Sequence, residues 1–276
     1  MKMCGIIGYI GMQDATPVLV DGLRRLEYRG YDSTGIAVKN GDISIHKRIG
    51  KVADLESVLP NKIEGTCGIA HTRWATHGGV TDANAHPHAS EDGKVAIIHN
   101  GIIENASRIR KHLQSEGVKF SSETDSEVLV HLIHRYLTSG SAPLTAVRKA
   151  LRRVRGTWGL CVLFADHEAI ICARNGSPLV VGIGEGESYI ASDPHALTPY
   201  THRVIFLEDG DLAELTAGDV QTSRMDGSAA DSTVTTIEET WAEAELGDFP
   251  HFMLKEIHEQ PEALRHCITG RTLASE

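Results

Sequence analysis

Residues 4–10 read Cys-Gly-Ile-Ile-Gly-Tyr-Ile. Apolar side chains fill this run almost without interruption, which is typical of a strand that is buried on both faces. The next segment predicts an amphipathic helix with Pro17 in its first turn, because apolar residues recur there at helical spacing. Asp14 or Thr16 is its expected cap, and its apolar face is formed by Leu19, Leu23 and Leu26.

Beyond this first strand and helix, strand patterns and helix patterns alternate and then give way to strands alone. Asn40-Gly41-Asp42 lies between the apolar runs Thr34–Val38 and Ile43–Ile49, which predicts a hairpin. Helical patterns cover residues 105–113, 124–136 and 144–154, and six short strands are expected between residues 160 and 216. This order favours an α+β fold, a layered sandwich, over a doubly wound parallel sheet.

Three predictions concern the middle of the chain. Residues 72–94 lack any sustained period and are expected to form a loop, and such long loops are often functional. Asn100-Gly101 closes a predicted strand and is typical of a turn, although an Asn amide and a Gly N–H can also form an oxyanion hole. Thr124-Asp125-Ser126-Glu127 fits a capping box, so Asp125 would lie in the first turn of a helix, where it could stabilise the helix end or bind a substrate ammonium group.

The composition of the chain argues against several classes of function. The chain has 276 residues and a formal net charge of −10 without any basic run, which argues against nucleic acid or an anionic membrane as a partner held by bulk charge. Five cysteines at wide spacing, with no CxxC, disfavour a disulfide scaffold or a structural zinc site. No signal peptide or apolar span is recognisable, so we expect a cytoplasmic protein.

Cys4 is the candidate nucleophile. A thiol is mostly protonated at neutral pH and needs a base. If the chain began at Cys4, its own α-amine, with a pKa of about 7.7–8.0, would serve as that base. The residues Met1-Lys2-Met3 would block this amine unless translation starts at Met3 or the extension is removed. The alternative reading of Cys4 is a buried strand cysteine.

The loop after the strand that ends near residue 71 holds further candidates. Arg73 suits a bidentate grip on a carboxylate, and Trp74 suits a lid. The alternative is an ordinary surface loop with a stacked tryptophan. Histidines also gather in this region, but no HExxH occurs and no acidic residue stands at ligand spacing, so a metal site is not expected.

Several blocks, in the same order, resemble the glutaminase domain of glutamine–fructose-6-phosphate aminotransferases, a class II amidotransferase domain of the N-terminal nucleophile type. They are Cys4–Gly8, Leu23–Gly35, His71–Gly78, Asn84–His88, His99–Asn105 and Ser122–Asp125. The stretch from His251 to Pro261 resembles the family's junction between domains. The resemblance implies a four-layer αββα sandwich, with residues 4–222 as the glutaminase domain and residues 223–276 as a peripheral arm and linker.

The resemblance also implies roles for single residues. Cys4 would attack the side-chain amide of L-glutamine, while Asn100 and Gly101 would stabilise the oxyanion. Arg73 would bind the α-carboxylate of glutamine and Asp125 its α-amine. Trp74 would act as a gate for ammonia. The remaining pocket residues implied by the family are Thr76, His77 and Gly78. No cofactor is implied.

The family continues into sugar-isomerase domains, and nothing after Pro261 could supply them. We therefore expect an isolated, monomeric glutaminase half, which supplies ammonia for glucosamine 6-phosphate synthesis from fructose 6-phosphate. One alternative is an amidotransferase serving another acceptor. Others are a glutamine-binding module without turnover, if Met1-Lys2-Met3 is retained, and metal-dependent hydrolysis by the histidine loop.

Overall fold

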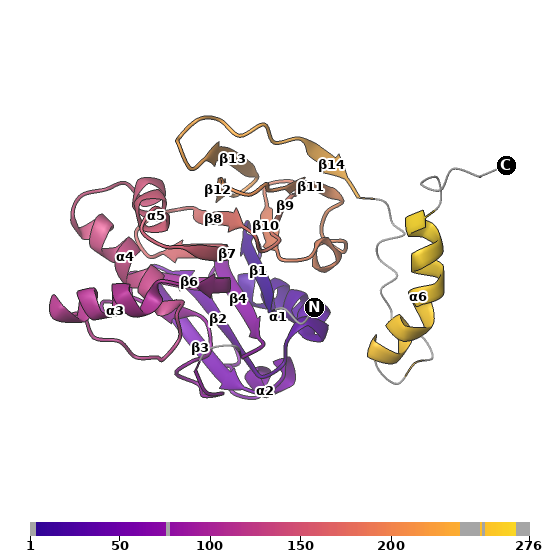
Figure 1. Cartoon of the computed structure of the whole chain (residues 1–276), viewed down its shortest axis with the longest axis horizontal. Helices are drawn as coiled ribbons and strands as arrows, with labels where there is room; N and C mark the ends of the chain where they lie inside the picture. Colours follow the sequence, from indigo (N-terminus) through magenta and orange to yellow (C-terminus); the bar gives the residue numbers. More distant parts are fainter. Residues whose placement is uncertain (1–3, 76–77, 238–248, 250–251, 269–276) are drawn as a thin grey trace. The chain divides into compact units, whose positions relative to one another are not determined.

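The computed structural model describes residues 4–75, 78–237, 249 and 252–268. The chain divides into two compact units, residues 1–238 and 239–276. Two antiparallel sheets form the first unit (Figure 1). The eight-stranded sheet has the order β14-β11-β9-β10-β1-β4-β2-β3, and the six-stranded sheet has the order β13-β12-β8-β7-β6-β5.

The strands of the larger sheet are β1 (Gly5–Ile10), β2 (Ser33–Asn40), β3 (Asp42–Ile49), β4 (Cys67–Arg73), β9 (Val180–Ile183), β10 (Ser188–Ala191), β11 (Arg203–Phe206) and β14 (Val234–Thr236). Those of the smaller sheet are β5 (His88–Ala89), β6 (Val95–Ile103), β7 (Gly156–Phe164), β8 (Ile170–Asn175), β12 (Asp211–Thr216) and β13 (Asp219–Arg224). The helices of this unit are α1 (Ala15–Leu26), α2 (Val52–Glu56), α3 (Ala106–Ser115), α4 (Glu127–Thr138) and α5 (Pro143–Leu151), with short 3₁₀ turns at Glu27–Arg29 and Pro194–Ala196.

Alternation along the central strands builds three apolar layers. In β1, Ile7 and Tyr9 pack with α1, whereas Ile6 and Ile10 pack into the layer between the two sheets. In β6, Ile97 likewise joins the layer under α3, α4 and α5, on the opposite side from the layer between the sheets. Both faces of both strands are therefore buried, as the apolar run at residues 4–10 predicts. The four-layer αββα sandwich is confirmed.

Most local predictions agree with these elements. The hairpin of β2 and β3 turns at Gly41, whose φ is 73°. Helix α1 follows Asp14, although the Asp14 side chain makes no capping hydrogen bond. Pro17 lies in the first turn of this helix, as expected.

Two predictions about the middle of the chain were wrong. Asn100-Gly101 does not end a strand in a turn, because β6 continues to Ile103 and pairs with β7 throughout. The Thr124–Glu127 capping box does not form either. Helix α4 begins at Glu127, after Ser126, so Asp125 precedes the helix. The Glu127 carboxylate instead accepts hydrogen bonds from the backbone N–H groups of Ser121 and Ser122, at 2.7 and 2.8 Å.

The C-terminal region also differs from the expected arm. Strand β13 runs through residue 222, and β14 pairs with β11 in the larger sheet, so the first compact unit extends to residue 238. In the second unit, α6 (Phe252–Ile268) contains Pro261. No helix within the described residues is both long enough and apolar enough to cross a membrane.

Candidate active site

Cys4 precedes β1, at the end of the larger sheet where β4 also finishes. The neighbouring Gly5 pairs with Thr72 of β4, and its N–H donates to the Thr72 hydroxyl at 3.1 Å. This pairing brings the Cys4 thiol against the backbone of Trp74. The Trp74 N–H donates to Cys4 Sγ at 3.1 Å, and the thiol donates to the Trp74 carbonyl at 3.5 Å.

The environment of the thiol keeps it protonated unless a base is present. Burial raises the pKa of the Cys4 thiol, because a thiolate would lose its hydration. The Trp74 N–H and the cationic side chains of Arg73 and Arg29 oppose that effect, since each stabilises a negative sulfur. The site therefore suits a thiolate that forms only while a nearby base accepts its proton.

Two side chains hold the backbone carbonyl of Cys4. Asn100 Nδ2 donates to it at 2.9 Å, and Arg29 Nε donates at 3.2 Å. Arg29 is itself fixed by Asp193, whose carboxylate oxygen lies 3.1 Å from Arg29 Nη1 and also accepts a hydrogen bond from Tyr28. These contacts fix the backbone of Cys4.

The side chain of Asn100 is oriented by His71. His71 Nε2 lies 2.9 Å from Asn100 Oδ1, and because an amide oxygen only accepts, the imidazole is the donor. Burial lowers the pKa of His71 to about 3, so the ring is neutral at physiological pH. Because His71 holds the amide oxygen of Asn100, its Nδ2 group faces Cys4 and donates to the Cys4 carbonyl.

Gly101 has a backbone conformation that other residues rarely adopt. Its φ is 131°, and an added Cβ would collide with the Thr157 carbonyl oxygen on β7. Glycine is therefore required for β6 to continue past Asn100 at this point. The same conformation exposes the Gly101 backbone to the cavity beside Cys4.

That cavity is small and lined by groups of both charges. Its volume of about 30 Å³ is room for roughly two water molecules. Arg73 lies on one wall, where its Nη1 donates to the Gly79 carbonyl at 3.2 Å. Asp125 lies on another wall and accepts a hydrogen bond from the Ile103 N–H at 2.7 Å. The lining residues are Cys4, Arg73, Trp74, His86, His99, Gly101, Thr124, Asp125 and Ser126.

The structure describes two of the four other residues expected at the site. Trp74 lines the cavity and packs edge-on against Tyr31, with ring centroids 5.5 Å apart. Gly78 is exposed, and a Cβ there would approach Asn84 and Glu123 rather than Cys4. Thr76 and His77 lie outside the described residues.

Sequence reasoning missed the supporting shell of this site. His71 and His99 belonged to matching blocks and to the histidines considered for a metal site, which was not expected, and Arg29 belonged to a matching block. In the structure the His99 ring is fixed from both sides, because its Nδ1 accepts from the Ser126 hydroxyl at 2.8 Å and its Nε2 donates to the Thr157 carbonyl at 3.2 Å. Burial lowers the pKa of His99 as well, so this ring too is uncharged.

The histidines near the site do not assemble as metal ligands. The rings of His71, His86 and His88 form a buried row, tilted in the first pair and edge-on in the second, with centroids 4.3 and 4.5 Å apart. Burial lowers the pKa of all three rings. Within the described part of the chain, no group of three or more His, Cys, Asp or Glu side chains is arranged to hold a metal ion.

Comparison with known proteins supports an amidotransferase. A family model described as a glutamine amidotransferase domain matches residues 71–199. A glutamine–fructose-6-phosphate aminotransferase (isomerizing) from Thermus thermophilus is 51% identical over 271 residues, which is 98% of this chain and 44% of that protein. Its counterpart from Chlorobaculum tepidum is 48% identical over 281 residues, covering 99% of this chain and 46% of that protein. The chain thus spans just under half the length of these relatives.

Solved structures agree at the level of the fold. The structure titled as the allosteric regulatory enzyme of purine biosynthesis matches with a TM-score of 0.71 and 26% identity, over 80% of this chain and 49% of that one. The glutamine phosphoribosylpyrophosphate amidotransferase of B. subtilis matches with a TM-score of 0.70 and 24% identity, over the same shares. The chain carries a glutamine amidotransferase domain and belongs to that family.

Proposed function

We propose that this protein hydrolyses the side-chain amide of L-glutamine to glutamate and ammonia through a thioester on Cys4. One observation carries the proposal: a single cavity is lined by a thiol, a strained glycine backbone, a guanidinium and a carboxylate, from Cys4, Gly101, Arg73 and Asp125. These are the groups needed to attack an amide and to hold the two charged ends of an amino acid.

In the first step the thiol transfers its proton to a base as the sulfur attacks the amide carbon. The proposed base is the α-amine of Cys4, when this residue is the first of the chain. Its ordinary pKa of about 7.7–8.0 leaves a useful neutral fraction near pH 7. The raised pKa of the buried thiol supports the need for such a base.

In the tetrahedral intermediate the former carbonyl oxygen carries the negative charge. We assign its stabilisation to the second N–H of Asn100 and to the backbone N–H of Gly101. The protonated amine then donates its proton to the departing nitrogen, which leaves as ammonia, and the thioester remains. Attack by water on the thioester releases glutamate and restores the thiol.

Recognition of glutamine follows from the charges on the cavity walls. Arg73 would pair with the α-carboxylate and Asp125 with the α-ammonium group, and Thr76, His77 and Gly78 would complete the pocket. The cavity has room for roughly two water molecules, so we infer that a wall moves when glutamine binds. Trp74, which is only half-buried, is the proposed gate between glutamine and the route taken by ammonia.

The aminotransferase relatives, which are about twice as long as this chain, suggest which acceptor receives the ammonia. We propose that this domain, residues 4–222 with the strands that follow, serves sugar-isomerase domains that convert fructose 6-phosphate to glucosamine 6-phosphate. We also propose a cytoplasmic location, which the free thiols of Cys67, Cys161 and Cys172 support.

The test compares two purified forms of the chain, one beginning at Cys4 and one retaining Met1-Lys2-Met3. The form with a free Cys4 amine should release ammonia and glutamate from glutamine, whereas the extended form should be at least a hundredfold slower. Cys4→Ala, in a chain beginning at residue 4, should abolish release while still binding glutamine in calorimetry. Equal turnover by Cys4→Ala would contradict the proposal, and binding without turnover in every form would make the protein a glutamine-binding module.

A further inference from the structure

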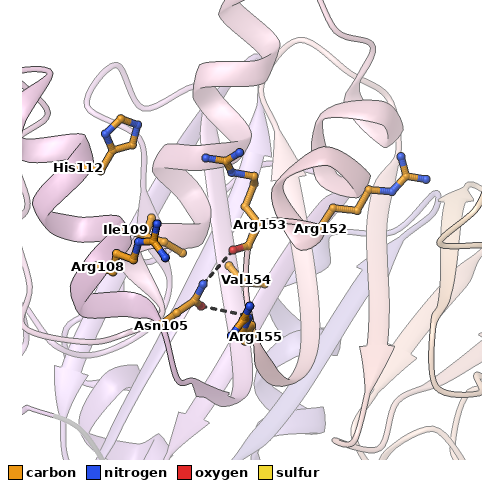
Figure 2. Close-up of a pocket in the computed structure, with 8 residues that line it drawn as sticks. All are labelled: Asn105, Arg108, Ile109, His112, Arg152, Arg153, Val154 and Arg155. Carbon is orange, nitrogen blue, oxygen red and sulfur yellow. Dashed lines mark hydrogen bonds between the residues drawn. The ribbon is translucent and has the colours of Figure 1, made fainter.

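A second pocket lies outside the candidate active site, between the start of α3 and the segment that joins α5 to β7 (Figure 2). Its volume is about 540 Å³, which is typical of sites for small organic molecules. Asn105, Arg108, Ile109 and His112 come from the α3 side, and residues 152–155, Arg-Arg-Val-Arg, come from the other side. None of these residues takes part in the proposed hydrolysis.

The lining of this pocket is strongly cationic. Four arginines and a histidine line it, and no carboxylate does, although the whole chain has a net charge of −10. Within the described residues, none of the four arginines forms an ion pair, and Arg152 donates only to the neutral Met225 carbonyl, at 2.6 Å. His112 lies 3.6 Å from Glu116, but Arg135 also pairs with that carboxylate. The positive charge in this pocket is therefore uncompensated.

Hydrogen bonds to the backbone hold the two sides of the pocket together. Asn105 Nδ2 donates to the Arg153 carbonyl and Asn105 Oδ1 accepts from the Arg155 N–H, both at 2.9 Å (Figure 2). The Glu104 N–H also donates to the Arg155 carbonyl at 2.9 Å. These bonds tie the arginine segment to α3. Ile109 and Val154 pack on the apolar layer under α3, so the pocket also has an apolar part.

Helix stability explains only part of this arrangement. Arg152 and Arg153 follow the C-terminus of α5, where a cation is stabilised by the helix dipole. Arg108 lies in the first turn of α3, where the dipole disfavours a cation, and that turn contains no acidic residue. Folding alone therefore gives no reason to place Arg108 opposite the other arginines, whereas an anion between them would.

We propose that this pocket binds a small organic molecule that carries at least two phosphate groups. Guanidinium groups present paired N–H donors that match phosphate oxygens, which is why arginine is common where phosphate groups are recognised. Several arginines around one concavity match a ligand with several negative charges, and the surface of Ile109 and Val154 leaves room for its organic part. A nucleoside diphosphate and a sugar bisphosphate share this chemistry.

The test measures binding by isothermal titration calorimetry at an ionic strength of about 0.15 M, where weak surface attraction is largely screened. The probes are inorganic pyrophosphate, ADP, fructose 1,6-bisphosphate and, as a phosphate-free anion of similar charge, citrate. We expect pyrophosphate to bind and at least one organic phosphate to bind more tightly, which identifies the source. Citrate should bind at least tenfold more weakly than pyrophosphate.

Charge-reversal variants test whether pyrophosphate binds in this pocket. Arg108→Glu/Arg153→Glu should weaken pyrophosphate binding at least tenfold. The control Lys111→Glu/Arg203→Glu makes the same change in net charge at exposed positions outside the pocket and should leave binding unchanged. All these side chains are exposed, so both variants should keep the melting temperature of the parent. No binding of any phosphate probe at millimolar concentration, equal binding of citrate, or equal loss in the control variant would overturn the proposal. Because the readout is binding, a failure of glutamine hydrolysis would leave this result intact.

Discussion

At the scale of single residues, Asn100 connects Cys4 to the rest of the candidate site. Its amide group touches the Cys4 carbonyl on one side and the His71 ring on the other. The sequence pattern favoured a turn at Asn100 and left an oxyanion hole as the alternative, which the resemblance then implied. The partner His71 could not be predicted, because 29 residues separate the two and only the stacking of the two sheets brings them together.

Removing His71 should therefore lower the rate of hydrolysis without weakening glutamine binding. In His71→Ala the Asn100 amide loses the donor that orients it, and we expect kcat to fall at least tenfold while KM changes little, since an oxyanion donor contributes about 10²–10³ to kcat. His71→Gln keeps an N–H near the position of Nε2 and should recover most of that rate. Steady-state kinetics of both variants is the measurement, and equal losses of kcat in the two would contradict the positioning role.

The same buried ring predicts how stability depends on pH. His71 has a pKa of about 3 in the folded protein against an ordinary value of 6.5, so below pH 6.5 the unfolded chain binds a proton that the folded chain does not. Stability falls as the pH drops from 6.5 toward 3, and His71 alone contributes a loss of about 2 kcal/mol by pH 5. Urea unfolding at pH 7 and pH 5 measures the loss of stability between the two pH values. In His71→Gln this loss should be smaller than in the parent by about 2 kcal/mol. An identical pH dependence in the variant would refute it.

At the scale of elements, β6 shows how tertiary pairing overrides a local turn signal. Asn-Gly is a strong turn signal in isolation, but here pairing with Gly159 and Trp158 of β7 keeps these residues in the sheet. The cost falls on Gly101, whose φ only glycine tolerates easily. Tertiary pairing therefore overrides the local signal at a residue of the candidate site. Similarly, the Glu127 carboxylate accepts hydrogen bonds from the Ser121 and Ser122 N–H groups and therefore does not form the predicted capping box.

Gly101→Ala should be more destabilising than an ordinary glycine substitution at positive φ. The control is Gly41→Ala in the β2–β3 hairpin, where φ is 73° and no atom lies within 4 Å of the added Cβ. Both substitutions carry a conformational cost of about 1–2 kcal/mol. Gly101→Ala adds a collision with the Thr157 carbonyl, which we expect to cost a further 1–3 kcal/mol or so. Urea unfolding of both variants measures the difference, and equal losses would show that β6 tolerates a side chain there.

At the scale of the whole molecule, sequence patterns were sufficient for the layered fold but not for the strand order. Alternating and continuous apolar runs predicted which segments are strands and that helices cover them. They could not predict that β1 pairs with β10 and β4, which lie far from it in sequence. That pairing puts Arg73, at the end of β4, beside Cys4. Likewise, polar composition after residue 222 hid β14, because an exposed edge strand needs few apolar residues.

The compact units predict where the chain can be shortened. A chain ending at residue 238 should keep the unfolding free energy of the full chain to within about 0.5 kcal/mol, because the first unit is then intact. A chain ending at residue 222 loses β14 and the buried side chain of Ile237, and should be less stable by at least about 2 kcal/mol. Chemical denaturation of both truncations is the measurement. Equal stability would show that the strand after residue 222 contributes nothing.

The most direct test of the central claim is to trap the bond between the protein and its substrate. A chain beginning at Cys4 is mixed with glutamine, quenched in acid during turnover and analysed by intact mass and peptide mapping. We predict a fraction of the protein heavier by one glutamyl group, attached to Cys4, and none in the Cys4→Ala chain or in the form that retains Met1-Lys2-Met3. Turnover of glutamine with no adduct on Cys4, or an adduct on another residue, would contradict the account.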